Sequence, residues 1–378
     1  MEENFDAIQP TRSINIVLMA LGVWTFINRK WFWIYRLYTY ILHLIASLCF
    51  AIMMNINLVS ADNLKDFLES IFMTFTLNAM MVKIINVVYY GRKVVKLMEN
   101  FQDEKFKLEN DKEYKIIKDS HKRFNLFKKF YIFLCLSVIS TSYINGFILH
   151  KMPYVSWFPF DWRKNDTYFY YAYIYEVISM TINCLTNLNL DLFQTYILFQ
   201  TGLYYELIIM RLKNIGYEHE ELAMKNLIKT IKSHQLLTKI SKDVETIVSA
   251  PVAVQNILSA AVICLTAYEL VTVSLKDNTF EFISLLYFLV TMAFQIFLPC
   301  FYGHVITERS ELLCDAIYSS NWVDVSVKMK KFIFIYMESL KRPIIIKAGS
   351  IFNVDLSVFT KTINNSYSLF ALLMSLEK

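Results

Sequence analysis

The sequence contains little glycine, little proline and little charge. Its 378 residues include 7 glycines and 6 prolines, which disfavours a sheet fold with many tight turns. Charged residues make up 19% of the chain, against about 25% in a typical soluble protein. Apolar residues fill 56% of the positions instead. This composition predicts an all-α integral membrane protein.

The sequence also lacks the residue patterns of catalytic and metal sites. No two of its six histidines lie within two helical turns of each other, and the spacing of its six cysteines matches no zinc site. The nearest pair of glycines, Gly202 and Gly216, is too widely spaced for a phosphate-binding loop or a Gly-x-Ser-x-Gly turn. We therefore expect no metal, no cofactor and no enzymatic activity.

Long apolar runs predict seven transmembrane helices, because a helix needs about 20 apolar residues to cross a bilayer. The fourth run is longer than a bilayer requires, so we expect it to tilt or to project into the cytoplasm. A shorter apolar stretch, 14–27, predicts an interfacial or re-entrant helix. The seven runs are 34–58, 67–90, 128–149, 168–200, 250–275, 281–303 and 346–374.

The distribution of Lys and Arg predicts the orientation of these helices. Twelve such residues lie in 91–129, seven in 201–249 and six in 304–345, whereas the alternating loops hold one to three each. The basic segments and the N-terminus are therefore predicted to be cytoplasmic. Asn165 begins an Asn-Asp-Thr glycosylation sequence in a loop predicted to be extracellular, which agrees with this orientation.

A cytoplasmic N-terminus argues against a G-protein-coupled receptor, in which that end lies outside the cell. The chain also has no Asp-Arg-Tyr triplet after the third span and no Asn-Pro-x-x-Tyr in the last. The lysine-rich segment 91–129 is explained by the bias of positive charge toward the cytoplasm, so we expect no nucleic-acid partner.

Polar residues inside the predicted spans are candidates for function, because each is costly in a bilayer. Lys83 lies near the cytoplasmic end of its helix, where its ammonium group can reach the membrane surface. Asn183, Asn187, Asp191 and Gln194 share one face of the fourth span. That face fits either packing within the bundle or an ion-coordinating site.

The last span carries an unusual number of polar residues, which a helix facing lipid would not tolerate. One interpretation is a helix that lines a water-filled pore between several subunits. The other is a central helix buried within a transporter or receptor. The polar residues include Asp355, Thr360, Lys361, Thr362, Asn364, Asn365, Ser366, Ser368 and Ser375.

Two cytoplasmic segments, 219–249 and 305–340, are amphipathic and predict helices that extend beyond the membrane. Pro251 follows the first of them, so we expect the helix to bend or to start afresh there. The helices could pack against partner subunits or form a compact domain within one subunit.

Four stretches of the sequence carry a family pattern. They are LMALGVW (18–24), HQLLTKISKDVETIVSAPVAVQNILSAAVICLTAYEL (234–270), CFYGHVITERSELLCDAIYSSNWVD (300–324) and KRPIIIKAGSIFNVDLSVFTKTINNSYSLFALL (341–373). The first resembles the short pre-helix motif of insect odorant receptors, the second resembles their fifth helix, and the last two resemble their closing segments. The likeness is strongest over the last 160 residues, roughly, and generic before them.

This resemblance implies a ligand-gated, nonselective cation channel in the plasma membrane. In that family an odour-specific subunit assembles with a shared co-receptor into a tetramer whose last helices line a central pore. The segment before the fifth helix is short, so this chain resembles the odour-tuning subunit rather than the co-receptor. A gustatory receptor and a metabotropic seven-helix receptor are the alternatives.

The resemblance also divides the chain into functional regions. Residues 1–33 are the cytoplasmic N-terminus with its short helix, and 34–303 hold the first six transmembrane helices with the odorant pocket. Cytoplasmic anchor helices occupy 203–249 and 304–345, and the pore-lining helix occupies 346–378. The expected partners are the co-receptor, a small volatile organic ligand and membrane lipid.

Inward faces in the outer half of the bundle supply the predicted ligand-binding residues. A stripe of aromatic residues at helical spacing fits simple packing as well. The predicted set is Phe72, Phe75, Thr76, Ser142, Asn145, Tyr171, Tyr175, Ile178, Ser179, Tyr268, Tyr287 and Thr291.

The predicted pore gate is Leu372, which the resemblance aligns with the family's hydrophobic gate. Ser368 and Ser375 lie one turn on either side of it, and Asn364 and Asn365 lie a further turn in. A ring of leucines can close a pore by excluding water. The alternative is that Leu372 packs against the fifth and sixth helices.

Overall fold

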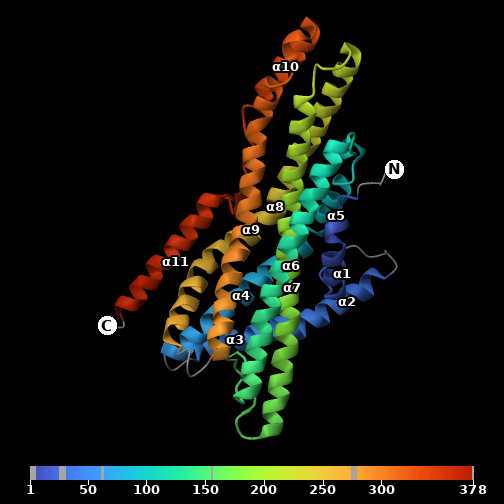
Figure 1. Cartoon of the computed structure of the whole chain (residues 1–378). Coiled ribbons are helices and arrows are strands. Elements are labelled where there is room, and N and C mark those ends of the chain that lie inside the picture. Colours follow the sequence, from blue (N-terminus) through green and yellow to red (C-terminus); the bar gives the residue numbers. More distant parts are fainter. Residues whose placement is uncertain (1–5, 25–30, 61–63, 155, 274–278, 377–378) are drawn as a thin grey trace.

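The structure, a computed structural model, describes residues 6–24, 31–60, 64–154, 156–273 and 279–376. Long helices dominate these residues (Figure 1). The helices are α1 (Arg12–Ala20), α2 (Phe32–His43), α3 (Cys49–Val59), α4 (Leu64–Tyr89), α5 (Gly91–Asn100), α6 (Asp111–Ile148), α7 (Asp166–Lys213), α8 (Glu220–Thr272), α9 (Thr279–Tyr318), α10 (Val327–Leu340) and α11 (Leu356–Leu376). Two short strands, β1 (Lys347–Ala348) and β2 (Phe352–Asn353), pair in antiparallel register.

The predicted spans fall on these helices, which confirms an all-α membrane fold. A π-helical turn, Leu44–Leu48, joins α2 and α3 into one continuous span. The described stretches that are long and apolar enough to cross a membrane are Phe32–Val59, Ser70–Tyr89, Asp111–Ile148, Glu220–Thr272 and Thr279–Tyr318. The predicted fourth and seventh spans correspond to α7 and α11, which carry more polar residues.

Helix α7 is the central element of the fold. It is 48 residues long, which corresponds to about 72 Å and far exceeds the ~30 Å hydrocarbon core. Between Leu188 and Leu212 nearly every side chain is buried, because α7 is apolar on most of its circumference there and packs against α8 and α9. The prediction of a fourth helix longer than a bilayer requires is confirmed.

The helices α8 and α9, of 53 and 40 residues, are also longer than a bilayer requires, and they run toward α10 (Figure 1). Leu227, Leu237, Ile240, Val244 and Ile247 of α8 are all fully buried, at the spacing expected of an amphipathic helix. The sequence left open whether α8 bends or starts afresh at Pro251. The structure shows one helix that continues through this proline.

The prediction that the last helix begins near Ile346 is wrong. The chain first forms the β1–β2 pair, where Gly349 adopts a left-handed backbone conformation with φ of 59°. Helix α11 then starts at Leu356, because the Asp355 carboxylate caps it by accepting a hydrogen bond from the Val358 N–H at 3.1 Å. Leu372 therefore lies about 24 Å along the helix rather than the ~39 Å that a start at Ile346 implies.

Helix α11 lies to one side of the bundle, in contact with α8 and α9 (Figure 1). Thr362 and Ser366 face those helices and are buried. Most of the remaining surface of α11 is open in this single chain. The polar face of the last helix is thus left uncovered by its own subunit.

Candidate functional site

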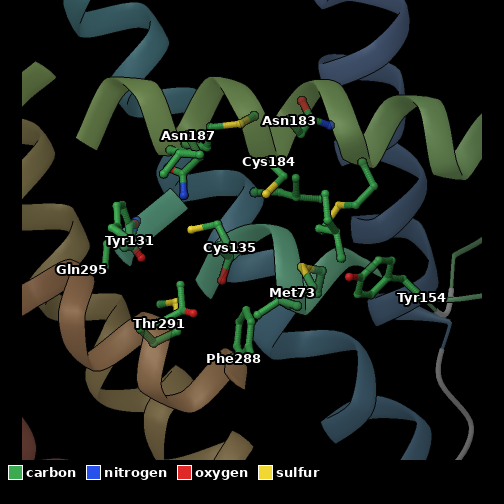
Figure 2. Close-up of a pocket in the computed structure, with 18 residues that line it drawn as sticks. Met73, Tyr131, Cys135, Tyr154, Asn183, Cys184, Asn187, Phe288, Thr291 and Gln295 are labelled. Atoms are coloured by element: carbon green, nitrogen blue, oxygen red, sulfur yellow. The ribbon is translucent and has the colours of Figure 1, made fainter. Parts of the chain in front are cut away.

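A cavity of about 70 Å³ lies in the helix bundle between α4, α6, α7 and α9 (Figure 2). Its lining is mainly apolar and includes four methionines, Met73, Met80, Met180 and Met292. Methionine side chains are flexible and polarizable, so they can move to admit ligands of different shapes. The cavity has the chemistry of a binding site for a small apolar molecule.

One end of the cavity is polar and built around a buried carboxylate. Asp191 of α7 accepts hydrogen bonds from the Tyr131 hydroxyl at 3.2 Å and from the Gln295 amide. Its other oxygen lies 2.6 Å from Nζ of Lys83, which also donates to Asn187 at 2.8 Å. Four helices therefore contribute to one polar cluster, of which Tyr131, Asn187 and Gln295 line the cavity.

The expectation that Lys83 reaches the membrane surface is wrong. Its residue is 1% exposed, because the carboxylate of Asp191 on the neighbouring helix offers a closer partner. Charges inside a membrane bundle usually pair with one another. The polar stripe on α7 also makes contacts within the bundle. Asn183 accepts from Ser47 at 2.6 Å and donates to the Ala46 carbonyl, and both Asn183 and Asn187 line the cavity.

The opposite end of the cavity is closed by Tyr154, which belongs to the loop between α6 and α7 (Figure 2). This loop is fastened to α7 by Glu176. The Glu176 carboxylate accepts a hydrogen bond from the Tyr154 backbone N–H at 2.6 Å and another from the Ser156 hydroxyl at 3.3 Å. Glu176 is completely buried, so its oxygens are held by these donors rather than by water.

The structure brings two of the predicted ligand-binding residues into this cavity, Thr76 and Thr291. Phe72 lies directly behind the wall, with its ring 5.4 Å from that of Phe288. Ser142 bonds to Ser284 at 2.8 Å, which links α6 to α9. The roles of these residues stay predictions.

The other predicted ligand-binding residues lie away from the cavity wall. Tyr171 and Ile178 are 64% and 54% exposed and face outward from α7. Tyr175 donates to the Ile45 carbonyl at 2.8 Å, on the side of α7 that faces the first span. The remaining members are buried or partly buried among helices without lining the cavity: Phe75, Asn145, Ser179, Tyr268 and Tyr287.

Sequence reasoning missed Tyr131, Tyr154 and Gln295. Tyr154 lies in a loop, where no helical periodicity marks an inward side chain. For Gln295 and Tyr131 the signal was weak but present, since each is a polar side chain inside an apolar run. A carboxylate within a span, such as Asp191, needs hydrogen-bond donors from other helices, and the polar residues of the other spans were the candidates for that role.

The predicted pore residues all lie on the exposed surface of α11. Asn364, Asn365, Ser368 and Ser375 are exposed, and Leu372 is 56% exposed. Packing of Leu372 into its own subunit, the alternative reading of the sequence, does not occur in this structure. The face is available to other subunits.

Asn165, the predicted glycosylation site, is exposed and lies at the N-terminus of α7. Its side-chain amide oxygen, Oδ1, caps the helix by accepting a hydrogen bond from the Thr167 N–H at 3.3 Å. The side-chain nitrogen, to which a glycan is attached, is not used in that cap. Glycosylation of Asn165 stays a prediction.

Comparison with known proteins gives the family. The chain matches the 7tm Odorant receptor family over residues 63–367. The chain belongs to the odorant receptor family. It is 31% identical to Odorant receptor 94a of Drosophila melanogaster, with 99% of each chain aligned, and 26% identical to Odorant receptor 33a over about three quarters of each.

The fold of this odorant receptor is also that of a solved relative. The insect olfactory receptor OR5 from Machilis hrabei, in complex with eugenol, superposes with a TM-score of 0.86 at 18% identity. That comparison covers 98% of this chain and 100% of the other. A second structure of the same receptor superposes with a TM-score of 0.78. As a member of the odorant receptor family, the chain is a multi-pass membrane receptor and not an enzyme.

This odorant receptor also exposes apolar side chains on α10. Val327, Phe334 and Ile335 are 70%, 55% and 72% exposed. Large exposed apolar groups gathered on one helix are common at protein interfaces.

Proposed function

We propose that this receptor is the odorant-binding subunit of a ligand-gated, nonselective cation channel, which it forms in the plasma membrane with the olfactory co-receptor. Two observations together carry the proposal: a mainly apolar cavity within the helix bundle, and a last helix whose polar residues are largely exposed. The cavity supplies a site for a small ligand, and α11 supplies a polar surface that only further subunits could enclose.

The cavity supports a small volatile organic ligand. Apolar side chains, methionines among them, make most of its wall, and its volume of about 70 Å³ is smaller than the several hundred Å³ of a drug-sized site. A ligand would therefore have to be small, and the methionines would have to shift around it. The relative from Machilis hrabei was solved with eugenol, which is a molecule of that kind.

The open surfaces support the heteromeric channel. Several copies of α11 around an axis would enclose Asn364, Asn365, Ser368 and Ser375 in a water-filled pore and relieve their exposure to lipid. Contacts between the exposed apolar residues of α10 and a neighbouring subunit would hold that arrangement from the cytoplasmic side. The co-receptor is the expected neighbour of an odour-tuning subunit.

The test is to express the receptor with and without the co-receptor and to record membrane current during an odorant panel. We expect odorant-evoked cation current from the pair and none from the receptor alone. Chemical crosslinking of an α10 cysteine variant, such as Ile335→Cys, to the co-receptor would report the assembly independently. A second-messenger response without current would overturn the channel and favour a metabotropic receptor.

A further inference from the structure

Tyr154 presents an unpaired hydroxyl to the cavity. Its residue is 8% exposed, and Figure 2 shows the hydroxyl directed inward from the end opposite Tyr131. The oxygen is enclosed and has no hydrogen-bond partner within the described part of the chain. The Ser142 hydroxyl interacts with it only weakly, from beyond hydrogen-bond distance, and is itself paired with Ser284 at 2.8 Å. A buried hydroxyl without a partner is rare in folded proteins and calls for an explanation.

The other described hydroxyls that line the cavity are already used. Thr76 donates to the Phe72 carbonyl at 2.9 Å, and Thr291 donates to the Tyr287 carbonyl at 2.7 Å. The Tyr131 hydroxyl donates to Asp191. Tyr154 is thus the hydroxyl in this wall whose proton is free for a guest molecule.

Glu176 holds this hydroxyl in place independently of any ligand. Its carboxylate accepts the backbone N–H of Tyr154 at 2.6 Å, which fixes the base of the side chain. The second carboxylate oxygen accepts a hydrogen bond from the Ser156 hydroxyl. A donor that is already positioned loses little conformational entropy on binding, which favours affinity and selectivity.

We propose that Tyr154 is the hydrogen-bonding residue of the odorant site, and that the site selects small apolar molecules with an accepting oxygen, such as ketones, esters and aryl ethers. The proposal rests on the proposed function, because it assigns the ligand class of the same cavity. The ligand's apolar body lies among the methionines and Phe288, and its oxygen accepts from the Tyr154 hydroxyl. Hydrocarbons of the same shape fit the cavity and leave the hydroxyl unpaired, so they bind more weakly.

Two pairs of matched probes test this selection, because each pair differs only in the accepting oxygen. Acetophenone is compared with α-methylstyrene, and anisole with ethylbenzene, as agonists of the receptor expressed with the co-receptor. Binding of the same four probes to the purified complex is measured by thermal shift. We expect the oxygen compound of each pair to act at a concentration about threefold to tenfold lower, the range expected of one neutral hydrogen bond.

The decisive variant is Tyr154→Phe, which removes the hydroxyl and keeps the ring. It should weaken the response to the oxygen compound alone, so that the two probes of each pair become similarly potent. A hydrocarbon response equal to that of the wild type would show that the variant folds. Tyr171→Phe is the matched control, since Tyr171 is 64% exposed and its hydroxyl lies outside the cavity. That variant should keep the wild-type ratio.

The role of Glu176 in positioning is tested by two further variants. Glu176→Gln keeps an oxygen that accepts the Tyr154 N–H, so it should preserve the potency ratio between the oxygen compound and the hydrocarbon of each pair. Glu176→Leu removes both accepted bonds and should reduce the ratio while the hydrocarbons still act. A ratio that survives Glu176→Leu would remove Glu176 from the proposal.

The outcomes separate this proposal from the proposed function. Three outcomes would overturn the role of Tyr154. The two probes of each pair could be equally potent on the wild-type receptor, Tyr154→Phe could weaken both probes of a pair alike, or none of the four probes could bind. Odorant-evoked current would still stand in those cases. Absence of current with every odorant of the panel would instead overturn the proposed function.

Discussion

Lys83 of α4 and Asp191 of α7 form an ion pair inside the helix bundle, with 2.6 Å between Nζ and the nearer carboxylate oxygen. Their side chains are 2% and 11% exposed. Tyr131, Asn187 and Gln295 complete the hydrogen bonds around the pair. Three polar side chains of the cavity wall are thereby held in fixed orientations by charges that the cavity itself does not contact.

The first prediction concerns the removal of one charge of this pair. Lys83→Met leaves the Asp191 carboxylate buried without its counter-ion, at a cost of about 3–5 kcal/mol, which is a large part of a typical protein's stability. We expect a strong loss of surface expression and of thermal stability in the detergent-solubilised receptor. Asp191→Asn alone should be similarly harmful.

The double variant Lys83→Gln with Asp191→Asn serves as the control. It keeps hydrogen-bonding groups at both positions and removes both charges, so most of the lost stability should return. If the double variant is no more stable than the two single variants, the charges do not interact as the structure indicates.

The second prediction concerns the crossing of α9 by the segment that leads into α11. A Cβ atom at Gly303 would lie 2.2 Å from the Val354 carbonyl oxygen, a backbone atom that cannot move aside without shifting the start of α11. Gly303→Ala should therefore lower stability by about 1–3 kcal/mol and reduce odorant-evoked current at equal surface expression.

Gly202→Ala is the matched control for that substitution. Its Cβ would meet side-chain atoms and no backbone atom, the nearest being Cγ1 of Val305 at 3.3 Å, and alanine favours the helix by ~1 kcal/mol over glycine. Its stability should stay equal or rise. Equal thermal stability of the two alanine variants would contradict the close contact between Gly303 and Val354.

The sequence was sufficient to predict the helices and the anchor extensions, because both rest on long-range periodicity that few residues interrupt. Leu227, Leu237 and Ile240 of α8 repeat at helical spacing and are all buried. The cavity wall was only partly predictable, because it depends on how helices rotate against one another. Lys83 pairs inward since Asp191 happens to face it, and no local pattern on α4 encodes that contact.

The start of α11 shows a second limit of the sequence. Apolar and polar residues alternate irregularly between Ile346 and Leu356, so hydropathy extended the helix through a segment that turns back on itself. The deciding features are local. Gly349 takes a positive φ, and Asp355 caps the new helix. Both residue types are helix boundary signals, which outweigh average hydropathy in such a short segment.

The third prediction concerns His234 in the cytoplasmic anchor region. Burial lowers its pKa from 6.5 to about 4, since the imidazole lies beside the rings of Tyr205 and Tyr336 and loses contact with water. A lowered pKa means that the unfolded chain binds a proton more readily than the folded one. Stability should thus be constant above pH 6.5 and fall by about 3 kcal/mol between pH 6.5 and pH 4.

The measurement is the unfolding temperature of the solubilised receptor across that pH range. His234→Phe keeps an aromatic ring and removes the titrating group, so its stability should depend less on acid. His121, whose pKa is also lowered by burial, remains in both proteins, and the difference between the two curves isolates His234. Parallel curves would show that His234 titrates normally in the folded receptor.

The fourth prediction places the channel gate at Leu372. This side chain is 56% exposed on α11, and the serines on either side of it donate their protons back into the helix. Ser368 donates to the Asn364 carbonyl at 3.0 Å, and Ser375 donates to the Leu372 carbonyl at 2.7 Å. With their protons engaged, these hydroxyls offer lone pairs outward, which suits a passing cation.

A polar residue at the gate would keep water in the narrowest part of the pore, so Leu372→Ser should raise the ligand-free current of the receptor expressed with the co-receptor. Tyr367→Ser is the control, because Tyr367 is also exposed, at 71%, but lies on a different side of α11. It should leave the ligand-free current at the wild-type level. Current is recorded before and during odorant application at matched surface expression. A leak that is unchanged in Leu372→Ser, or raised equally by Tyr367→Ser, would place the gate elsewhere.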